Sequence, residues 1–136
     1  MKYLMLALIL AATATTAEAK HVRAEHMYIF GFSASFNDST LYITDIQDVQ
    51  GAWYDSKTKF LLARDSYSSQ LKEFLAEKKG QNDRVCLVMY ASTRKKAEKK
   101  YEALKKKYAS KDGIIYGLEY LRSDEFQFNI VDMSEE

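Results

Sequence analysis

The chain of 136 residues contains no proline, one cysteine, two histidines and five glycines. The single cysteine, Cys86, excludes an intramolecular disulfide, so a folded core must stabilise the protein without a covalent crosslink. Because proline and glycine- or serine-rich stretches are absent, no segment resembles an interdomain linker. The two histidines, His21 and His26, lie near the amino terminus and offer little for a zinc site or a histidine-dependent catalytic centre.

The short motifs of common enzymes are also missing. The sequence has no G-x-S-x-G nucleophile elbow, no H-E-x-x-H and no phosphate-binding glycine loop. Cys86 lies in an apolar run without a neighbouring histidine, so we expect a buried, unreactive thiol. We therefore expect a protein that is not an enzyme and uses no cofactor or metal. The alternative is a small extracytoplasmic hydrolase with a carboxylate pair from five aspartates: Asp38, Asp45, Asp48, Asp55 and Asp65.

Only one long hydrophobic run occurs, over residues 3–14, and it is too short to cross a bilayer as a permanent helix. It follows a positive start and precedes Ala17-Glu18-Ala19, whose small residues suit signal peptidase. We predict a cleavable signal peptide over residues 1–19, cut after Ala19, and one periplasmic or secreted domain over residues 20–136 without a transmembrane span. An uncleaved membrane anchor, or a buried helix of the fold, is the alternative. The run is not followed by a cysteine, so we expect no lipoprotein.

Apolar periodicity predicts an α+β fold. Strict alternation indicates a strand over residues 27–36, with Tyr28, Phe30 and Phe32 on one face. Residues 84–91 are apolar on both faces, which predicts a central strand. The remaining predicted strands cover residues 40–44, 114–121 and 126–130, while residues 46–63 give no clear pattern.

Two amphipathic helices complete the prediction. The first is capped by Asp65 or Ser66 and ends at Gly80; the second is capped by Ser92 or Thr93 and ends near residue 112. The order ββαβαββ predicts a two-layer sandwich, with one mixed or antiparallel sheet of about five strands and both helices on one face.

Positive charge gathers on the second predicted helix. The chain carries a formal net charge of +1, but residues 92–111 hold nine basic and two acidic side chains. Some of these cations fall in the first helical turn, where the helix dipole disfavours them. We therefore predict a docking surface for an anionic envelope component such as a glycan, lipid headgroup or acidic protein. A solvated face whose lysine stems shield the core is the alternative. The candidate contacts are Arg94, Lys95, Lys96, Lys99, Lys100 and Lys106.

Aromatic residues supply a second set of candidates. Tyr28, Tyr101 and Tyr108 fall on predicted apolar faces. Tyr42, Trp53, Tyr54 and Tyr67 remain as candidates, with core or rim packing as the alternative, and we take Tyr42, Trp53 and Tyr54 as the ligand contacts. Nucleic acid is not expected as a partner, because no aromatic is interleaved on the basic face.

The segment RVCLVMYASTRKKAE, residues 84–98, resembles the second half of a SPOR domain, a ferredoxin-like module that binds peptidoglycan. In both, a strand runs into a capped, charged helix with an Ala-Glu step. The first half of this chain departs from that pattern, because two predicted strands precede the first helix where the family has one. The glycine expected near the strand end is also absent. The resemblance is an analogy that implies glycan binding in the cell envelope.

Overall fold

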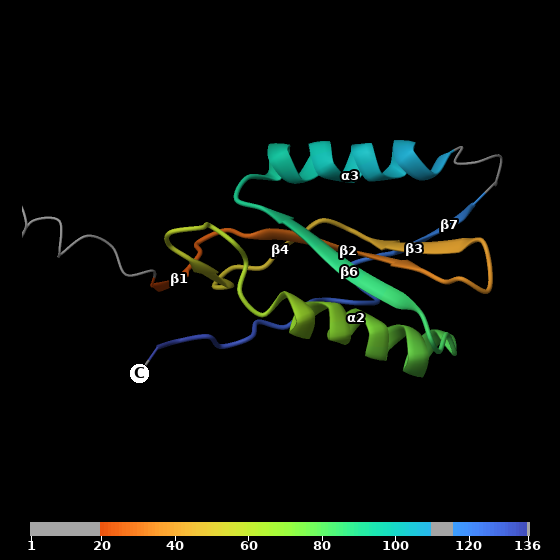
Figure 1. Ribbon diagram of the computed structural model, residues 1–136, viewed down its shortest axis with the longest axis horizontal. Coiled ribbons are helices and arrows are strands. Elements are labelled where there is room, and N and C mark those ends of the chain that lie inside the picture. The colour runs from red at the N-terminus through yellow and green to blue at the C-terminus, as the bar shows by residue number, and fades with distance from the viewer. Residues whose placement is uncertain (1–19, 110–115, 136) are drawn as a thin grey trace, which may run out of the picture.

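A computed structural model describes residues 20–109 and 116–135. Helix α2 (Arg64–Lys79) lies on one side of a five-stranded sheet and helix α3 (Arg94–Ala109) on the other (Figure 1). The predicted signal peptide and residues 110–115 lie outside the described part of the chain. Neither described helix is long and apolar enough to cross a membrane.

The sheet is mixed, and strand β2 (Tyr28–Ala34) is central in it. Strand β6 (Val85–Ala91) pairs antiparallel with the whole length of β2. The other edge of β2 is shared by the antiparallel strands β3 (Thr40–Thr44) and β4 (Gln47–Asp48). Strand β7 (Gly117–Leu121) runs parallel to β3. The predicted α+β class, with two helices and a mixed sheet of about five strands, is confirmed.

A second, two-stranded sheet lies beyond the amino-terminal end of β2. It pairs β1 (His21–Arg23) with β5 (Trp53–Asp55) in antiparallel register. Tyr54 also bridges to Leu61. The stretch without a clear sequence pattern thus forms β4, β5 and the connection to α2, and Figure 1 shows these segments at the end of the molecule where α3 begins.

Helix α2 forms the deeper half of the core. Its side chains Tyr67, Leu71 and Leu75 are fully buried at the predicted helical spacing. Gly31 of β2 faces this helix, and a Cβ atom there would lie 2.7 Å from Leu71 Cδ2. A small residue is therefore needed in β2, because α2 packs too closely against the strand for a larger one.

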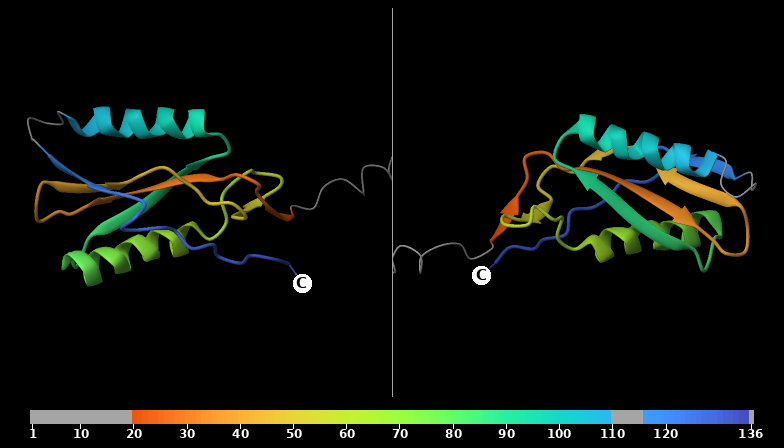
Figure 2. Two further views of the ribbon diagram at one scale, coloured as in Figure 1. Left: turned by 180° about the vertical axis from the view of Figure 1, so that it is seen from behind. Right: turned by 45° about the horizontal axis from the view of Figure 1, so that its top comes forward.

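Helix α3 packs on the opposite face of β2. The rings of Phe30 and Phe32 lie 5.2 and 5.1 Å from those of Tyr101 and Tyr108. Figure 2 shows the sheet between the two helices from two further sides. The prediction that both helices lie on one face is therefore wrong. Small residues such as Gly31 alternate with aromatics in β2 because one face receives α2 closely and not because that face is open to water.

Strand β6 is at an edge of the sheet, which corrects the predicted central position of residues 84–91. It pairs with β2, and no other strand of the described residues pairs with its outer edge. Both of its faces are apolar because α2 and α3 each contact it from opposite sides of the sheet. A strand that is covered on both faces has the sequence pattern of a central strand even where no strand pairs with one of its edges.

The predicted strand over residues 126–130 is absent, because this segment is extended but pairs with no strand. Phe126 and Phe128 are buried against α2, as their alternation indicates. The backbone here bonds to glutamine amides. The Gln47 side chain donates to Phe126 O at 2.9 Å and accepts from Phe128 N at 2.8 Å. Gln70 makes the same pair of bonds with Asn129.

The helix caps are partly as predicted. Thr93 caps α3, with its Oγ1 accepting a hydrogen bond from Lys96 N at 3.3 Å. Gly80 ends α2 in a left-handed conformation with φ 63°. Neither Asp65 nor Ser66 caps α2, because the helix starts earlier. Its N-cap is Ala63, which provides no side-chain hydrogen bond.

Candidate functional site

The solvent side of α3 is mostly basic, with Glu98 and Glu102 as its exposed acids. Ala97 is the one residue of this helix that is fully buried, and Tyr101 and Tyr108 are partly covered by the sheet. The first turn contains no acidic residue. All six basic candidates of this helix are exposed: Arg94, Lys95, Lys96, Lys99, Lys100 and Lys106.

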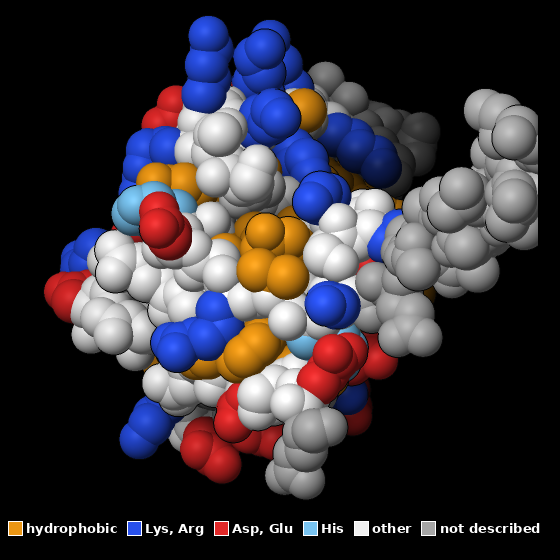
Figure 3. All heavy atoms as spheres, turned by 90° about the vertical axis from the view of Figure 1, so that its left-hand side faces the viewer, with side chains coloured by type: hydrophobic (Ala, Val, Ile, Leu, Met, Phe, Trp, Pro, Cys, Tyr) orange, Lys and Arg blue, Asp and Glu red, His pale blue; other side chains and the backbone are white. Residues whose placement is uncertain are grey.

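Two of these lysines line a groove with one of the predicted aromatics. Lys96 and Lys100 of α3 line it together with Tyr54 of β5. The groove has a volume of about 740 Å³. Figure 3 shows this end of the molecule, where hydrophobic side chains lie at the centre and lysine and arginine side chains surround them. The other lining residues are Arg23, Ala24, Glu25, His26, Met27, Lys59, Tyr90, Ala91 and Ser92.

The groove combines aromatic rings with cations. Lys59 Nζ lies 5.7 Å from the centre of the Tyr54 ring. Lys100 Nζ lies 5.3 Å from the Tyr90 ring and donates a hydrogen bond to Tyr90 O at 2.7 Å. Among the lining residues, four lysines or arginines stand against a single acid, Glu25. The groove therefore has a positive potential beside apolar rings, which suits a ligand with an anionic group and a flat apolar face.

One rim of the groove carries a hydrogen-bonded pair of His26 and Asp48. His26 Nδ1 lies 2.7 Å from Asp48 Oδ2, and the imidazole stacks on the Tyr28 ring at 6.1 Å between centroids. Burial raises the pKa of Asp48, but hydrogen bonds from His26 and Gln50 outweigh this effect, and the pKa lies below its ordinary value. Asp48 is therefore an ionised partner of His26.

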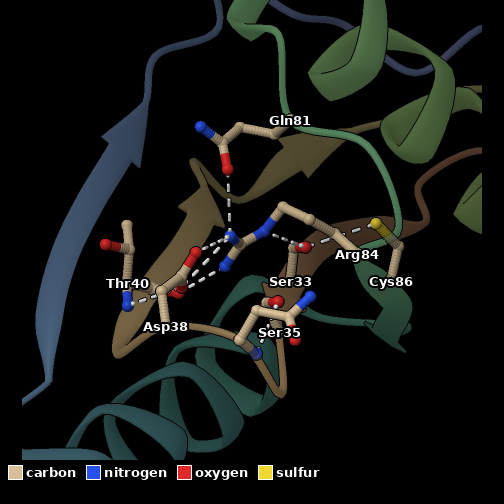
Figure 4. Close-up of polar contacts among 8 residues, drawn as sticks. Ser33, Ser35, Asp38, Thr40, Gln81, Arg84 and Cys86 are labelled. Carbon is tan, nitrogen blue, oxygen red and sulfur yellow. Dashed lines mark hydrogen bonds and ion pairs between the residues drawn. The ribbon is translucent and has the colours of Figure 1, made fainter.

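The most buried polar cluster of the described residues is centred on Arg84, which is 2% exposed (Figure 4). Its Nε donates to Ser33 Oγ at 3.1 Å, and its Nη1 pairs with Asp38 Oδ2 at 3.3 Å and bonds to Gln81. Its Nη2 donates to Thr40 O. These bonds tie the start of β6 to the β2–β3 hairpin, and they leave the guanidinium committed to the protein itself. The role of this cluster is structural.

Two residues singled out from the sequence adjoin Arg84. Tyr42 is 9% exposed, and its ring lies beneath the Arg84 guanidinium at 4.8 Å. Because Tyr42 is almost fully buried, it packs in the core and is not open to a ligand. Cys86 is half-buried, with Sγ 3.4 Å from Ser33 Oγ. Burial raises the pKa of the Cys86 thiol, which keeps it protonated near neutral pH.

The other predicted contacts are spread over the surface. Trp53 is half-buried in β5, with the Arg23 guanidinium 5.9 Å from its ring. Lys95 and Lys99 are exposed but do not line the groove, and Lys106 lines a different, more apolar groove near the end of α3. Of the nine predicted contacts, the structure brings Lys96, Lys100 and Tyr54 together at one site.

Sequence reasoning missed part of the groove. Arg23 and Lys59 come from segments whose pattern predicts no structure, and Tyr90 belongs to a strand that reads as core. These residues meet because the groove is lined jointly by the β1–β5 pair, the end of β6 and the start of α3. No local signal in the sequence marks that proximity, which depends on long-range packing.

The aspartates considered for catalysis are mostly engaged elsewhere. Beside the ion pairs of Asp38 and Asp48, the carboxylates of Asp45 and Asp55 accept backbone N–H groups at 2.9 and 2.8 Å. Asp65 is exposed in the first turn of α2. Within residues 20–109 and 116–135, no group of three or more histidine, cysteine or acidic side chains is placed to hold a metal ion.

Comparison with known proteins identified no relative of this chain. No protein-family model, curated protein or solved structure matches the chain.

Proposed function

We propose that this chain is an exported, non-catalytic binding domain that holds an anionic ligand in the groove between α3 and the β1–β5 pair. The observation that carries the proposal is the meeting of Lys96 and Lys100 with Tyr54 around one hollow. Export rests on the amino-terminal sequence, with its short apolar run and its Ala17-Glu18-Ala19 site.

An acidic glycan is the ligand that uses every feature of this groove. A sugar ring has an apolar face that packs against an aromatic ring such as Tyr54 or Tyr90, and its carboxylate or phosphate groups pair with lysines. A lipid headgroup in a membrane presents a broad plane, which does not fit a hollow of about 740 Å³. An acidic protein would use the lysines, but it needs no pair of aromatic rings lining a groove.

The state of the acidic and nucleophilic groups supports a binding role over hydrolysis. General acid–base chemistry needs a titratable group free to reach the substrate. In the groove Glu25 is the one carboxylate among the lining residues, and a sugar hydrolase of the usual kind uses two. The thiol of Cys86 is on the α2 side of the sheet and remains protonated.

Co-sedimentation with insoluble peptidoglycan, lipopolysaccharide and anionic vesicles tests the proposal and separates the ligand classes. We expect the protein to sediment with an acidic glycan and to be released as salt rises, because the Debye length falls from about 10 Å at 0.1 M to about 3 Å at 1 M. Neutral vesicles serve as the control for non-specific sedimentation.

Three outcomes would contradict this proposal. Sedimentation with anionic vesicles alone would indicate a lipid surface as the ligand. Binding that persists unchanged at 1 M salt would exclude the lysines as its source. Breakdown of the glycan during the assay would indicate the hydrolase alternative.

A further inference from the structure

A second groove lies beside the carboxyl-terminal half of α3. The helix itself packs on β2 and β6. The hollow next to it, between the end of α3 and strands β3 and β7, has a volume of about 330 Å³ and is named here the apolar groove. Leu41 and Ile43 of β3 form its floor and are 2% and 1% exposed. Leu104 of α3 and Leu118 of β7, both half-buried, line its sides.

The register of the strands explains why apolar side chains gather there. Ile43 pairs with Phe32 of β2, and Leu41 pairs with Leu118 of β7. Directly paired residues lie on the same face of a sheet, as do residues two apart on one strand. The apolar face that carries Phe32 under α3 therefore continues across β3 and β7. Among the described elements, neither helix packs on that face of β3 and β7.

The charged residues of the apolar groove all come from α3. They are Glu102, Lys105 and Lys106. Lys105 Nζ lies 3.8 Å from Glu102 Oε1, so these two charges offset each other. Lys106 is exposed, and no acidic side chain of residues 20–109 or 116–135 forms an ion pair with it. The apolar groove thus combines a hydrocarbon floor with one unpaired cation at its rim.

We propose that the apolar groove binds a monomeric amphiphile with one hydrocarbon chain and an anionic head group, such as a fatty acid. Water over Leu41 and Ile43 has few polar partners, so a hydrocarbon chain displaces it favourably. The carboxylate of the head group pairs with Lys106. This site is separate from the groove proposed for the glycan, because the two share no lining residue.

The dimensions of the apolar groove favour a single chain. Its lining residues on α3 extend from Glu102 to Ala109, which is about 10 Å along the helix axis. A volume of about 330 Å³ spread over that length suits one hydrocarbon chain. Pockets for small molecules have volumes of about 300–1,000 Å³, whereas a stable protein interface buries about 800 Å² on each partner. The apolar groove matches the first class and is too small for the second.

Calorimetric titration of the protein purified after expression of the full chain tests the proposal, with sodium decanoate as the probe. We expect saturable binding at one site. Octanoate should bind about tenfold more weakly, because each buried methylene contributes about fourfold in affinity. Decyl maltoside has the same chain with an uncharged head group and should bind about fivefold more weakly. No saturable binding of decanoate, or equal affinity for decanoate and either control, would overturn the proposal.

Two substitutions test the two parts of the site. Lys106→Glu should weaken decanoate binding about fivefold, because it replaces the cation that pairs with the carboxylate. Lys99→Glu is the matched control, since Lys99 is exposed on the same helix and lines neither groove. Leu104→Trp fills the apolar groove and should abolish decanoate binding, and far-ultraviolet circular dichroism checks that this variant folds. Equal effects of the two glutamate variants, or unchanged binding by folded L104W, would contradict the site.

The same titrations separate this site from the glycan groove. Lys96→Glu with Lys100→Glu should leave decanoate binding unchanged, because neither lysine lines the apolar groove. L104W should likewise leave binding of a soluble acidic oligosaccharide unchanged, because Leu104 does not line the glycan groove. Each proposal can therefore fail while the other holds. Loss of decanoate binding in the double variant, with binding retained in L104W, would place the chain in the glycan groove and overturn the inference.

Discussion

Helices α2 and α3 pack on opposite faces of one sheet, and they bury unequal numbers of side chains. Helix α2 contributes three fully buried side chains, Tyr67, Leu71 and Leu75, whereas α3 contributes only Ala97. The aromatic stripe of α3 stays partly exposed beside its lysines. Since burial of apolar area is the main source of stability, α2 stabilises the fold more strongly than α3 does.

The two faces of the sheet therefore differ in how closely their helix is packed. On the α2 side, close packing dictates residue size even in the facing strand, as at Gly31. On the α3 side, the helix rests on aromatic contacts and exposes cations that its own dipole disfavours. Helix α3 thus adds little to the core and carries an electrostatic cost, which agrees with the proposed role of its surface in binding.

Truncation of one leucine on each helix gives the largest expected effect. Leu71→Ala should lower the free energy of unfolding by about 2–5 kcal/mol, because Leu71 is fully buried and a cavity would remain. Leu104→Ala on α3 should cost about 1 kcal/mol or less, because that side chain is only half-buried. Urea unfolding of both variants measures the difference. Equal losses would contradict the inequality of the two helices.

Stability at alkaline pH tests how firmly Tyr101 of α3 is packed. Burial, followed by nearby negative charge, raises the pKa of Tyr101 to about 12. The folded state thus keeps this phenol protonated at a pH where the unfolded chain ionises it. The stability that depends on Tyr101 is complete below about pH 10 and is lost as the pH rises toward 12.

Replacement of that phenol provides the test. We expect Tyr101→Phe to lose less stability than the wild type between about pH 10 and pH 12, because the variant has no phenol to ionise at this position. Unfolding curves across that interval measure it, and the difference between the two proteins removes the contribution of the other tyrosines. Parallel pH profiles would show that Tyr101 is not held in a buried, protonated state.

The smallest expected effect concerns the first turn of α3. Lys95→Glu replaces an exposed cation near the positive end of the helix dipole with an anion, and it should raise the unfolding free energy by about 0.3–1 kcal/mol. Thermal or urea unfolding at low salt resolves the change. A decrease in stability would show that Lys95 has a stabilising partner and that the basic turn is not a cost to the fold.

Local patterns in the sequence predicted the elements better than their arrangement. The spacing of Tyr67, Leu71 and Leu75 located α2, and Thr93 located the start of α3. The face that each helix covers was not predictable, because Gly31 in β2 reads equally well as a solvent-facing or a closely packed position. The alternation at Phe126 and Phe128 marked burial correctly, but glutamine amides took the place of a neighbouring strand.

The candidate site was predictable to the same limited extent. Charge density marked Lys96 and Lys100, and composition marked Tyr54. Tyr42 was selected on the same ground, yet it is buried beneath Arg84, since composition carries no information on depth. The proximity of Tyr54 to α3 comes from packing between segments far apart in the chain, which no local pattern records.

The central claim is that α3 acts through the groove and not through its total charge, and a matched pair of charge reversals tests this most directly. Lys96→Glu with Lys100→Glu changes the groove, while Lys95→Glu with Lys99→Glu makes the same charge change on the same turns outside it. Calorimetric titration with a soluble acidic oligosaccharide should show an affinity loss of about tenfold or more for the first variant and a much smaller loss for the second. Equal losses in both variants would contradict the groove as the binding site.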